Sequence, residues 1–314
     1  MGSRRFPRRT NERVPYFRLL GAQLAIGAAA IFARYALLGA GPLAVSALRL
    51  VLAAIPLIAL AFLTRPRVPL GRRRELAFAL AGLALAAHFA CWIGSLLYTS
   101  VAISTLLVTT TPLFTEAYDA FVERRYPSRT FVVTVVLASA GIGLIALQRA
   151  TPAPVAGFAW LGSALALLGA LAIAVYLLVV RAAGARPASG TPLPTRQIVA
   201  RTYGWAAFAL VFASLFAHQG PPALGNVTSW FGILAMAFVS QLLGHTALNA
   251  ALRDFTPSTV SLATLLEPVI AALLAAALFA ERLSPQTIAG GILVLVAVGV
   301  TLRSAPPPEI ATLP

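Results

Sequence analysis

The fold is decided by residues 281–302, which read ERLSPQTIAGGILVLVAVGVTL and repeat an earlier stretch of the chain. Residues 123–144 read ERRYPSRTFVVTVVLASAGIGL, and a shift of 158 residues makes the two stretches identical at seven of 22 positions. Apolar segments match easily by chance, but the shared Glu-Arg-x-x-Pro start is polar. The alignment therefore indicates an internal repeat.

A second alignment extends the repeat toward the N-terminus. A shift of 156 residues places residues 100–112 on residues 256–268 and pairs Pro112 with Pro268. A two-residue deletion in the first copy explains the change of register. The repeat therefore includes more than one apolar segment in each half of the chain.

Composition indicates a membrane protein. Of the 314 residues, 59% are hydrophobic and 11% are charged, and the mean hydropathy is +0.86, which excludes an ordinary soluble domain. A helix needs about 20 apolar residues to cross a bilayer, and its internal hydrogen bonds satisfy the backbone there. Ten such spans are predicted, at residues 17–38, 43–63, 76–97, 101–121, 131–148, 157–180, 198–217, 230–252, 258–279 and 286–302.

The ten spans divide into two groups of five. Because five is odd, the second group enters the membrane from the opposite side, so the repeats are inverted. The sequence thus predicts an all-α integral membrane protein of ten transmembrane helices in two inverted five-helix repeats. The predicted parts are a basic tail at 1–16, the repeats at 17–148 and 157–302, and a second tail at 303–314.

Arginine determines the predicted orientation. All 24 basic residues are arginine, the acidic residues number 9, and the formal net charge is +15. These arginines lie mostly in short connections between spans, which is typical of membrane orientation signals and not of a nucleic-acid partner. Twenty fall on the face that holds both termini, and only Arg149 and Arg282 fall on the other. We therefore expect cytoplasmic termini in a bacterial inner membrane.

Two spans carry polar side chains on one helical face. Spacings of three or four residues bring the members of each set together near mid-depth. The third span contributes His88, Cys91, Trp92 and Ser95, and the eighth contributes Gln241, His245 and Asn249. We predict that both faces line a substrate cavity, where histidine can titrate and tryptophan can contact cations or rings. The alternative is that each histidine only joins neighbouring helices through one hydrogen bond.

Hydroxyl and carboxyl groups recur in the fourth and ninth spans. The fourth contains Thr105, Thr109, Pro112 and Glu116 on one stripe, and the ninth contains Ser261, Thr264 and Glu267. Proline in each span frees a backbone carbonyl for ligand binding or permits bending. We predict substrate contacts from Thr109, Glu116, Thr264 and Glu267, and proton coupling through Glu267, Glu116 or His88. A fixed hydrogen bond to a neighbouring helix is the alternative for Glu267.

Two arginines lie inside predicted spans. Arg34 falls near the outer end of the first span, and Arg49 falls one to two turns inside the second. The arginine fork matches a carboxylate, so both are candidate anion contacts. Snorkelling to the interface or structural pairing is the more common role of such residues.

The sequence contains no recognisable enzyme, cofactor or metal motif. It has no H-E-x-x-H, no G-x-S-x-G and no phosphate-binding glycine loop, so direct use of ATP is not expected. The single cysteine, Cys91, excludes an intramolecular disulfide and a cysteine metal cluster. Small-residue runs at 138–143 and 289–291 allow close helix packing within the fold or in a homodimer.

Several short segments also resemble a known family. They are Ala47-Leu48-Arg49-Leu50, Leu97-Tyr98-Thr99-Ser100, Pro112-Leu113, Leu266-Glu267-Pro268-Val269 and Glu281-Arg282-Leu283-Ser284-Pro285. Together they are similar to the EamA-like ten-helix members of the drug/metabolite transporter superfamily, over nearly the whole chain. The resemblance implies a central cavity between the halves, cytoplasmic termini, and export of amino acids, other metabolites or toxic compounds.

The sequence therefore predicts a secondary transporter that exports amino-acid-like or other small metabolites by alternating access, surrounded by membrane lipid. Two other classes stay open. One is a membrane-embedded enzyme on lipid-linked substrates, with His88, Glu116, His245 and Glu267 as an acid/base set. The other is a non-transporting scaffold or receptor. The lack of a nucleophile or metal cluster counts against the first, and the buried acids and inverted symmetry count against the second.

Overall fold

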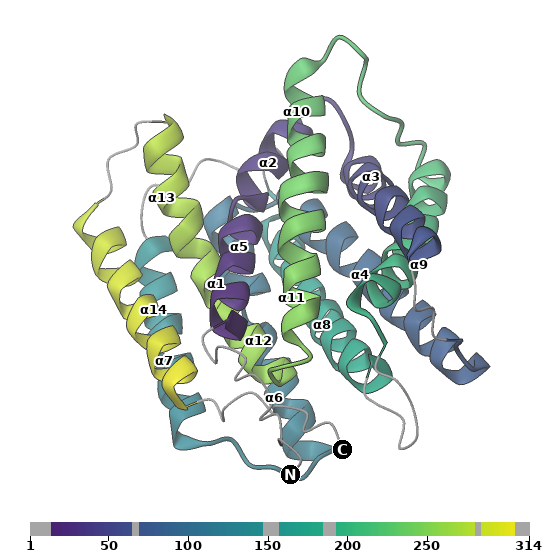
Figure 1. The fold of residues 1–314 in the computed structure, drawn as a ribbon. Helices are drawn as coiled ribbons and strands as arrows, with labels where there is room; N and C mark the ends of the chain where they lie inside the picture. The colour runs from purple at the N-terminus through teal and green to yellow at the C-terminus, as the bar shows by residue number, and fades with distance from the viewer. Residues whose placement is uncertain (1–13, 65–68, 147–156, 185–192, 280–283, 305–314) are drawn as a thin grey trace, which may run out of the picture.

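The computed structural model describes residues 14–64, 69–146, 157–184, 193–279 and 284–304, and within these ranges every regular element is a helix (Figure 1). Most of the two predicted tails lies outside the described residues, as do Arg65, Arg67, Arg149, Arg186, Glu281 and Arg282. Seven of the described helices are long and apolar enough to cross a membrane, and two shorter helices are also apolar.

The helices follow the predicted spans closely. The first repeat contains α1 (Val14–Gly27), α2 (Ala29–Ala36), α3 (Pro42–Leu63), α4 (Arg72–Ser95), α5 (Val101–Val108), α6 (Thr111–Phe121) and α7 (Arg129–Ala146). The second contains α8 (Ala159–Gly184), α9 (Thr195–Phe216), α10 (Val227–Ala235), a π-helical segment (Met236–His245), α11 (Thr246–Ala251), α12 (Pro257–Ala263), a 3₁₀ turn (Thr264–Leu266), α13 (Glu267–Phe279) and α14 (Pro285–Ser304). The largest differences are that α4 starts at residue 72 instead of the predicted 76 and that α8 ends at residue 184 instead of the predicted 180.

Packing between the repeats shows the inverted symmetry. The third helix of the first repeat, α4, packs along the first helix of the second, α8. The same pairing occurs with the repeats exchanged, because α10 and the π-helical segment pack along α2 and α1. The second helices, α3 and α9, pack on each other, and so do the fifth helices, α7 and α14. Each repeat therefore buries its apolar surface mainly against the other.

The fourth span of each repeat is broken at equivalent positions. Pro112 has no N–H to donate to the carbonyl of Val108, and the Thr111 hydroxyl donates to that carbonyl instead at 2.8 Å. With the 156-residue shift, Thr111 and Pro112 correspond to Glu267 and Pro268, where α12 ends and α13 begins. There the Glu267 amide donates to the carbonyl of Thr264, which Pro268 leaves free. Each freed carbonyl thus accepts one local hydrogen bond.

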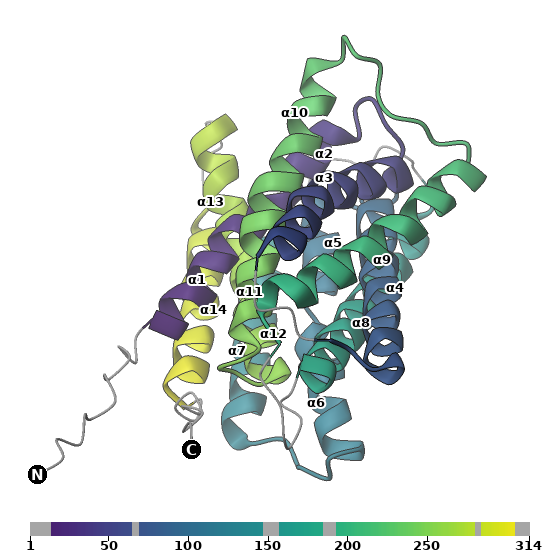
Figure 2. The same cartoon turned by 45° about the vertical axis from the view of Figure 1, so that its right-hand side comes forward.

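The helices form two apolar clusters within one bundle. In both views α7, α13 and α14 lie on one side and α3, α4 and α9 on the other (Figures 1 and 2). The smaller cluster is built from α7, α12, α13 and α14. Its helices approach closely because Gly141 and Gly290 face each other, and a Cβ on either would overlap the carbonyl oxygen of the other. These small residues therefore meet inside one chain.

Candidate functional site

A small cavity lies between the repeats near the two broken spans. Its volume is about 40 Å³, which is space for a few water molecules at most. Apolar walls come from residues such as Ile26, Val108, Ile173 and Leu248. The polar lining consists of Arg49, His88, Trp92, Thr109, Thr111, His245, Thr264 and Glu267. Six elements from both halves of the chain thus contribute a polar group to one cavity.

Arg49 is the most unusual residue of the cavity. It is 0% exposed, its Nε donates to Gln241 Oε1 at 2.9 Å, and its guanidinium lies 3.9 Å from the centre of the Phe89 ring. Neither Nη1 nor Nη2 has a hydrogen-bond partner among the described residues, although both are buried. An ionised group buried without a counter-charge costs several kcal/mol. The cavity therefore presents a fork of two unused, positively charged donors.

Glu267 lies in the same cavity as Arg49 without forming an ion pair with it or with another described residue. It is the first residue of α13, directly after the break in the ninth span. Thr111, its equivalent in the first repeat, lines the cavity as well. The two breaks therefore place one acid and one hydroxyl at matching positions of the inverted repeats.

The two histidines use their rings differently. His88 Nδ1 lies 2.9 Å from the carbonyl oxygen of Gly169, which only accepts, so this nitrogen carries the hydrogen. Its ring is parallel to that of Trp92, at 5° and 6.2 Å between centroids. His245 packs edge-on against Phe89, and its Nδ1 is buried without a described partner. Trp92 Nε1 is likewise buried without a partner. Buried nitrogens without a described hydrogen-bond partner thus border the cavity on several sides.

Four of the predicted site residues lie away from the cavity. Ser95 donates to the carbonyl of Trp92 and contacts Ser104, while Asn249 bonds to Tyr176 and to the carbonyl of His245. Arg34 is exposed on α2, and Glu116 is partly exposed on α6. Glu116 leaves the stripe of Thr109 because the helix breaks between them, so the spacing of seven residues no longer means one face.

Gln241 supports the cavity without lining it, through its hydrogen bond to Arg49. It lies with His245 in the π-helical segment, a type of distortion that is frequent at functional sites. The sequence did not indicate this segment, because four-residue spacing was read as a regular α-helix. It also did not single out Gln23, which is 0% exposed and has both side-chain polar atoms buried without a described partner. An isolated glutamine inside an apolar span was the available signal.

One end of the bundle is joined by polar contacts. At the terminal end, defined as the end where α1 begins and α14 ends, Thr115 and Ser261 hydroxyls lie 3.0 Å apart. Ser258 donates to Asp119 at 2.8 Å, so two hydrogen bonds connect α6 to α12. Further contacts at this end join Arg18 to Asp254 and Arg181 to the carbonyl of Leu252.

The opposite end of the same two spans lacks such contacts. The described residues of α5 and α13 form no hydrogen bond with each other, although the two helices are neighbours. In the repeat, α5 corresponds to α12 and α13 corresponds to α6. The hydrogen bonds between α6 and α12 therefore have no counterpart between the described residues of α5 and α13, and the two repeats differ in this respect. Among the described residues, hydrogen bonds between the fourth and ninth spans therefore occur at the terminal end only.

Sequence comparison identifies the family. The signature of the EamA-like transporter family matches twice, at residues 14–147 and 160–303. The chain belongs to this family. EamA-like proteins are membrane transporters of the drug/metabolite transporter type, so the predicted family and the fold of two repeats are confirmed.

One solved structure supports the fold. It is described only as "Crystal structure of protein", and it matches with a TM-score of 0.73 and 16% identity, covering 92% of this chain and 96% of its own. At this identity the likeness concerns the fold alone. No curated protein shows a significant match to the sequence.

Proposed function

We propose that this EamA-like protein is a secondary transporter that exports small, amino-acid-like metabolites by alternating access. The observation that carries the proposal is the buried guanidinium of Arg49 with two unpartnered nitrogens. The proposal places the protein in a bacterial inner membrane with both termini in the cytoplasm, because arginine is concentrated on that face.

A carboxylate is the group that suits Arg49. It would accept two parallel hydrogen bonds from Nη1 and Nη2, which have no hydrogen-bond partner among the described residues. Glu267, which also lines the cavity, offers a counter-charge for an amine. The stacked rings of His88 and Trp92 give a flat surface for the rest of the molecule. These features favour a substrate that carries both a carboxylate and an amine.

The size of the cavity supports a mechanism with moving halves. A cavity of about 40 Å³ holds only a few water molecules, so an amino acid enters only after the helices separate. The breaks at Pro112 and Pro268 supply bending points next to the lining residues. The hydrogen bonds between α6 and α12 close the terminal end, which this proposal equates with the cytoplasmic side. Breaking these contacts while the opposite end closes would complete a transport cycle.

Transport by purified protein in liposomes tests the proposal. We expect exchange of a panel of labelled amino acids to be accelerated by the native protein and lowered about 100-fold by Arg49→Gln, because two charge-assisted hydrogen bonds of about 1.5 kcal/mol each are lost. Arg34→Gln is the matched control, since Arg34 is exposed on α2 away from the cavity, and it should transport normally. Equal transport by folded Arg49→Gln and native protein would contradict the proposal.

A further inference from the structure

A second hollow lies on the outside of the bundle at the terminal end. It has a volume of about 730 Å³, which is within the usual range of ligand pockets. The end of α3 and the start of α9 form its walls, and Glu75 of α4 lies at its edge. It shares no lining residue with the central cavity. We refer to this hollow as the lateral groove.

The walls of the lateral groove are apolar and face outward. Ile58 and Phe62 of α3 oppose Phe208 of α9. Phe62 is 65% exposed and Phe208 is 57% exposed, so the groove opens toward the surrounding lipid and not toward the interior. An occupant that reaches it from the membrane is therefore expected to carry a hydrocarbon chain.

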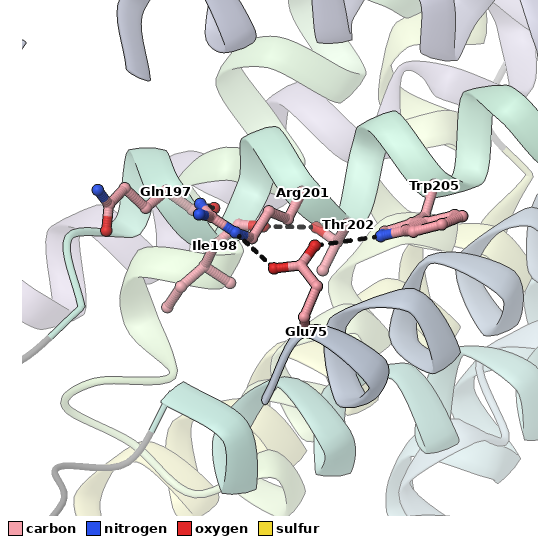
Figure 3. A network of polar contacts seen from close by, with 6 residues as sticks. All are labelled: Glu75, Gln197, Ile198, Arg201, Thr202 and Trp205. Atoms are coloured by element: carbon pink, nitrogen blue, oxygen red, sulfur yellow. Dashed lines mark hydrogen bonds and ion pairs between the residues drawn. The ribbon is translucent and has the colours of Figure 1, made fainter. Parts of the chain in front are cut away.

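One part of the lateral groove is polar and carries both signs of charge. Arg201 Nε donates to Glu75 Oε2 at 3.0 Å, its Nη1 donates to the carbonyl of Gln197 at 3.3 Å, and Trp205 Nε1 lies 3.5 Å from Glu75 Oε1 (Figure 3). The side chains of Arg201 and Glu75 keep 30% and 43% of their surface exposed. This network therefore offers a guanidinium and a carboxylate side by side to a ligand.

We infer that the lateral groove binds a phospholipid with a primary ammonium headgroup, of the phosphatidylethanolamine type. Its phosphate pairs with Arg201, its ammonium donates to Glu75, and one acyl chain lies along Ile58, Phe62 and Phe208. A headgroup with both charges can bond to both members of the pair, whereas an anionic lipid pairs with arginine alone and has no ammonium to donate to Glu75. A trimethylated headgroup fits less well because it has no N–H to donate.

The location agrees with this ligand. α4 begins with Arg72, Arg73 and Arg74, which places three further positive charges in the turn that contains Glu75. The inference puts the bilayer phosphates at this level, where amphipathic rings such as that of Trp205 are enriched. The carboxylate of Glu75 is held in place by Arg201 of α9, which lies 126 residues later in the sequence. Its fixed position favours one headgroup over another.

Lipid retention by the delipidated full-length protein tests the inference. Native mass spectrometry would compare phosphatidylethanolamine, phosphatidylcholine and phosphatidylglycerol of the same acyl composition. We expect roughly tenfold tighter retention of phosphatidylethanolamine, the size of one charge-assisted hydrogen bond. Glu75→Gln should remove the preference for phosphatidylethanolamine over phosphatidylcholine, and Arg201→Gln should weaken the binding of all three lipids.

Two further variants separate the headgroup site from folding effects. Asp254→Asn disrupts the ion pair with Arg18, which is similarly exposed at the same end of the bundle but outside the groove, and it should retain lipid normally. Gly204→Leu leaves both members of the ion pair in the chain and adds a side chain to the groove, where a Cβ meets only Ile58 at 3.6 Å, and it should displace the lipid. Equal retention of the three lipids by native protein, or full retention by Gly204→Leu, would overturn the inference.

Discussion

Arg49 and Arg201 both lie two turns after the start of the second helix of their repeat, but they have different surroundings. Arg49 is the eighth residue of α3 and Arg201 is the seventh of α9, and these two helices are the second of their repeats and pack on each other. Arg49 is 0% exposed and has no carboxylate partner among the described residues, whereas Arg201 is paired with Glu75. An inverted duplication can thus direct one arginine to a central cavity and the other to the lipid boundary.

The largest expected effect comes from removing the charge at Arg49. Arg49→Met should lower transport about 100-fold while changing thermal stability little, because loss of the hydrogen bond to Gln241 and of the contact with Phe89 is offset by removal of a buried charge whose two terminal nitrogens have no described partner. Proteoliposome exchange and thermal unfolding in detergent measure the two effects. Strong destabilisation together with lost transport would assign Arg49 a structural role instead.

Glu267→Gln should have the next largest effect, and it should depend on the substrate. If Glu267 pairs with the amine of the substrate, exchange of amino acids falls about tenfold, the value of one charge-assisted hydrogen bond. Exchange of matched carboxylates without an amine should be unchanged. A comparison of each amino acid with its deaminated analogue measures this difference. An equal decrease for both substrates would remove Glu267 from amine recognition.

The contact between α6 and α12 should have a smaller effect. Thr115→Val with Ser261→Ala removes one hydrogen bond between the two helices, along with each hydroxyl's contact to a carbonyl of its own helix, and retains most of the volume. The loss of about 1 kcal/mol shifts a two-state equilibrium roughly fivefold toward opening at the terminal end. In a Cys91→Ser background, a cysteine at Thr264 should then react faster with an impermeant thiol reagent applied from that side. Unchanged labelling would show that this hydrogen bond does not hold the end closed.

The difference between the two arginines also shows how far sequence reasoning reaches. The spans could be predicted because hydropathy and the repeat are both visible in the sequence itself. The described helix ends differ from the predicted span ends by four residues or fewer, and the largest differences are at the start of α4 and the end of α8. The Glu75–Arg201 pair was not predicted, because it joins residues 126 apart and depends on how α4 packs against α9. A contact between two side chains so far apart leaves no periodic pattern in a single sequence.

Part of the candidate site could also be predicted from the sequence, and part depended on tertiary packing. His88, His245 and Glu267 are polar residues inside apolar spans, so their types alone marked them, and the structure brings them to one cavity. Ser95 and Asn249 share their helical faces but are used in hydrogen bonds to neighbouring helices. Whether a polar group is free or already bonded depends on its tertiary neighbours. The unpartnered nitrogens of Arg49 likewise become evident only in the packed fold.

Arg201→Gln should have the smallest effect on stability. The pair with Glu75 is partly exposed, and such pairs contribute about 0–1 kcal/mol. Thermal unfolding in a detergent free of lipid should therefore differ little from the native protein. In phosphatidylethanolamine the native protein should gain stability that the variant lacks, because binding to the folded state stabilises it. The dependence on lipid separates the two roles. If the ion pair only joins α4 to α9, native protein and Arg201→Gln should differ in thermal stability by the same amount in every detergent and lipid. If it binds a headgroup, they should differ only when a phospholipid with a primary ammonium is present.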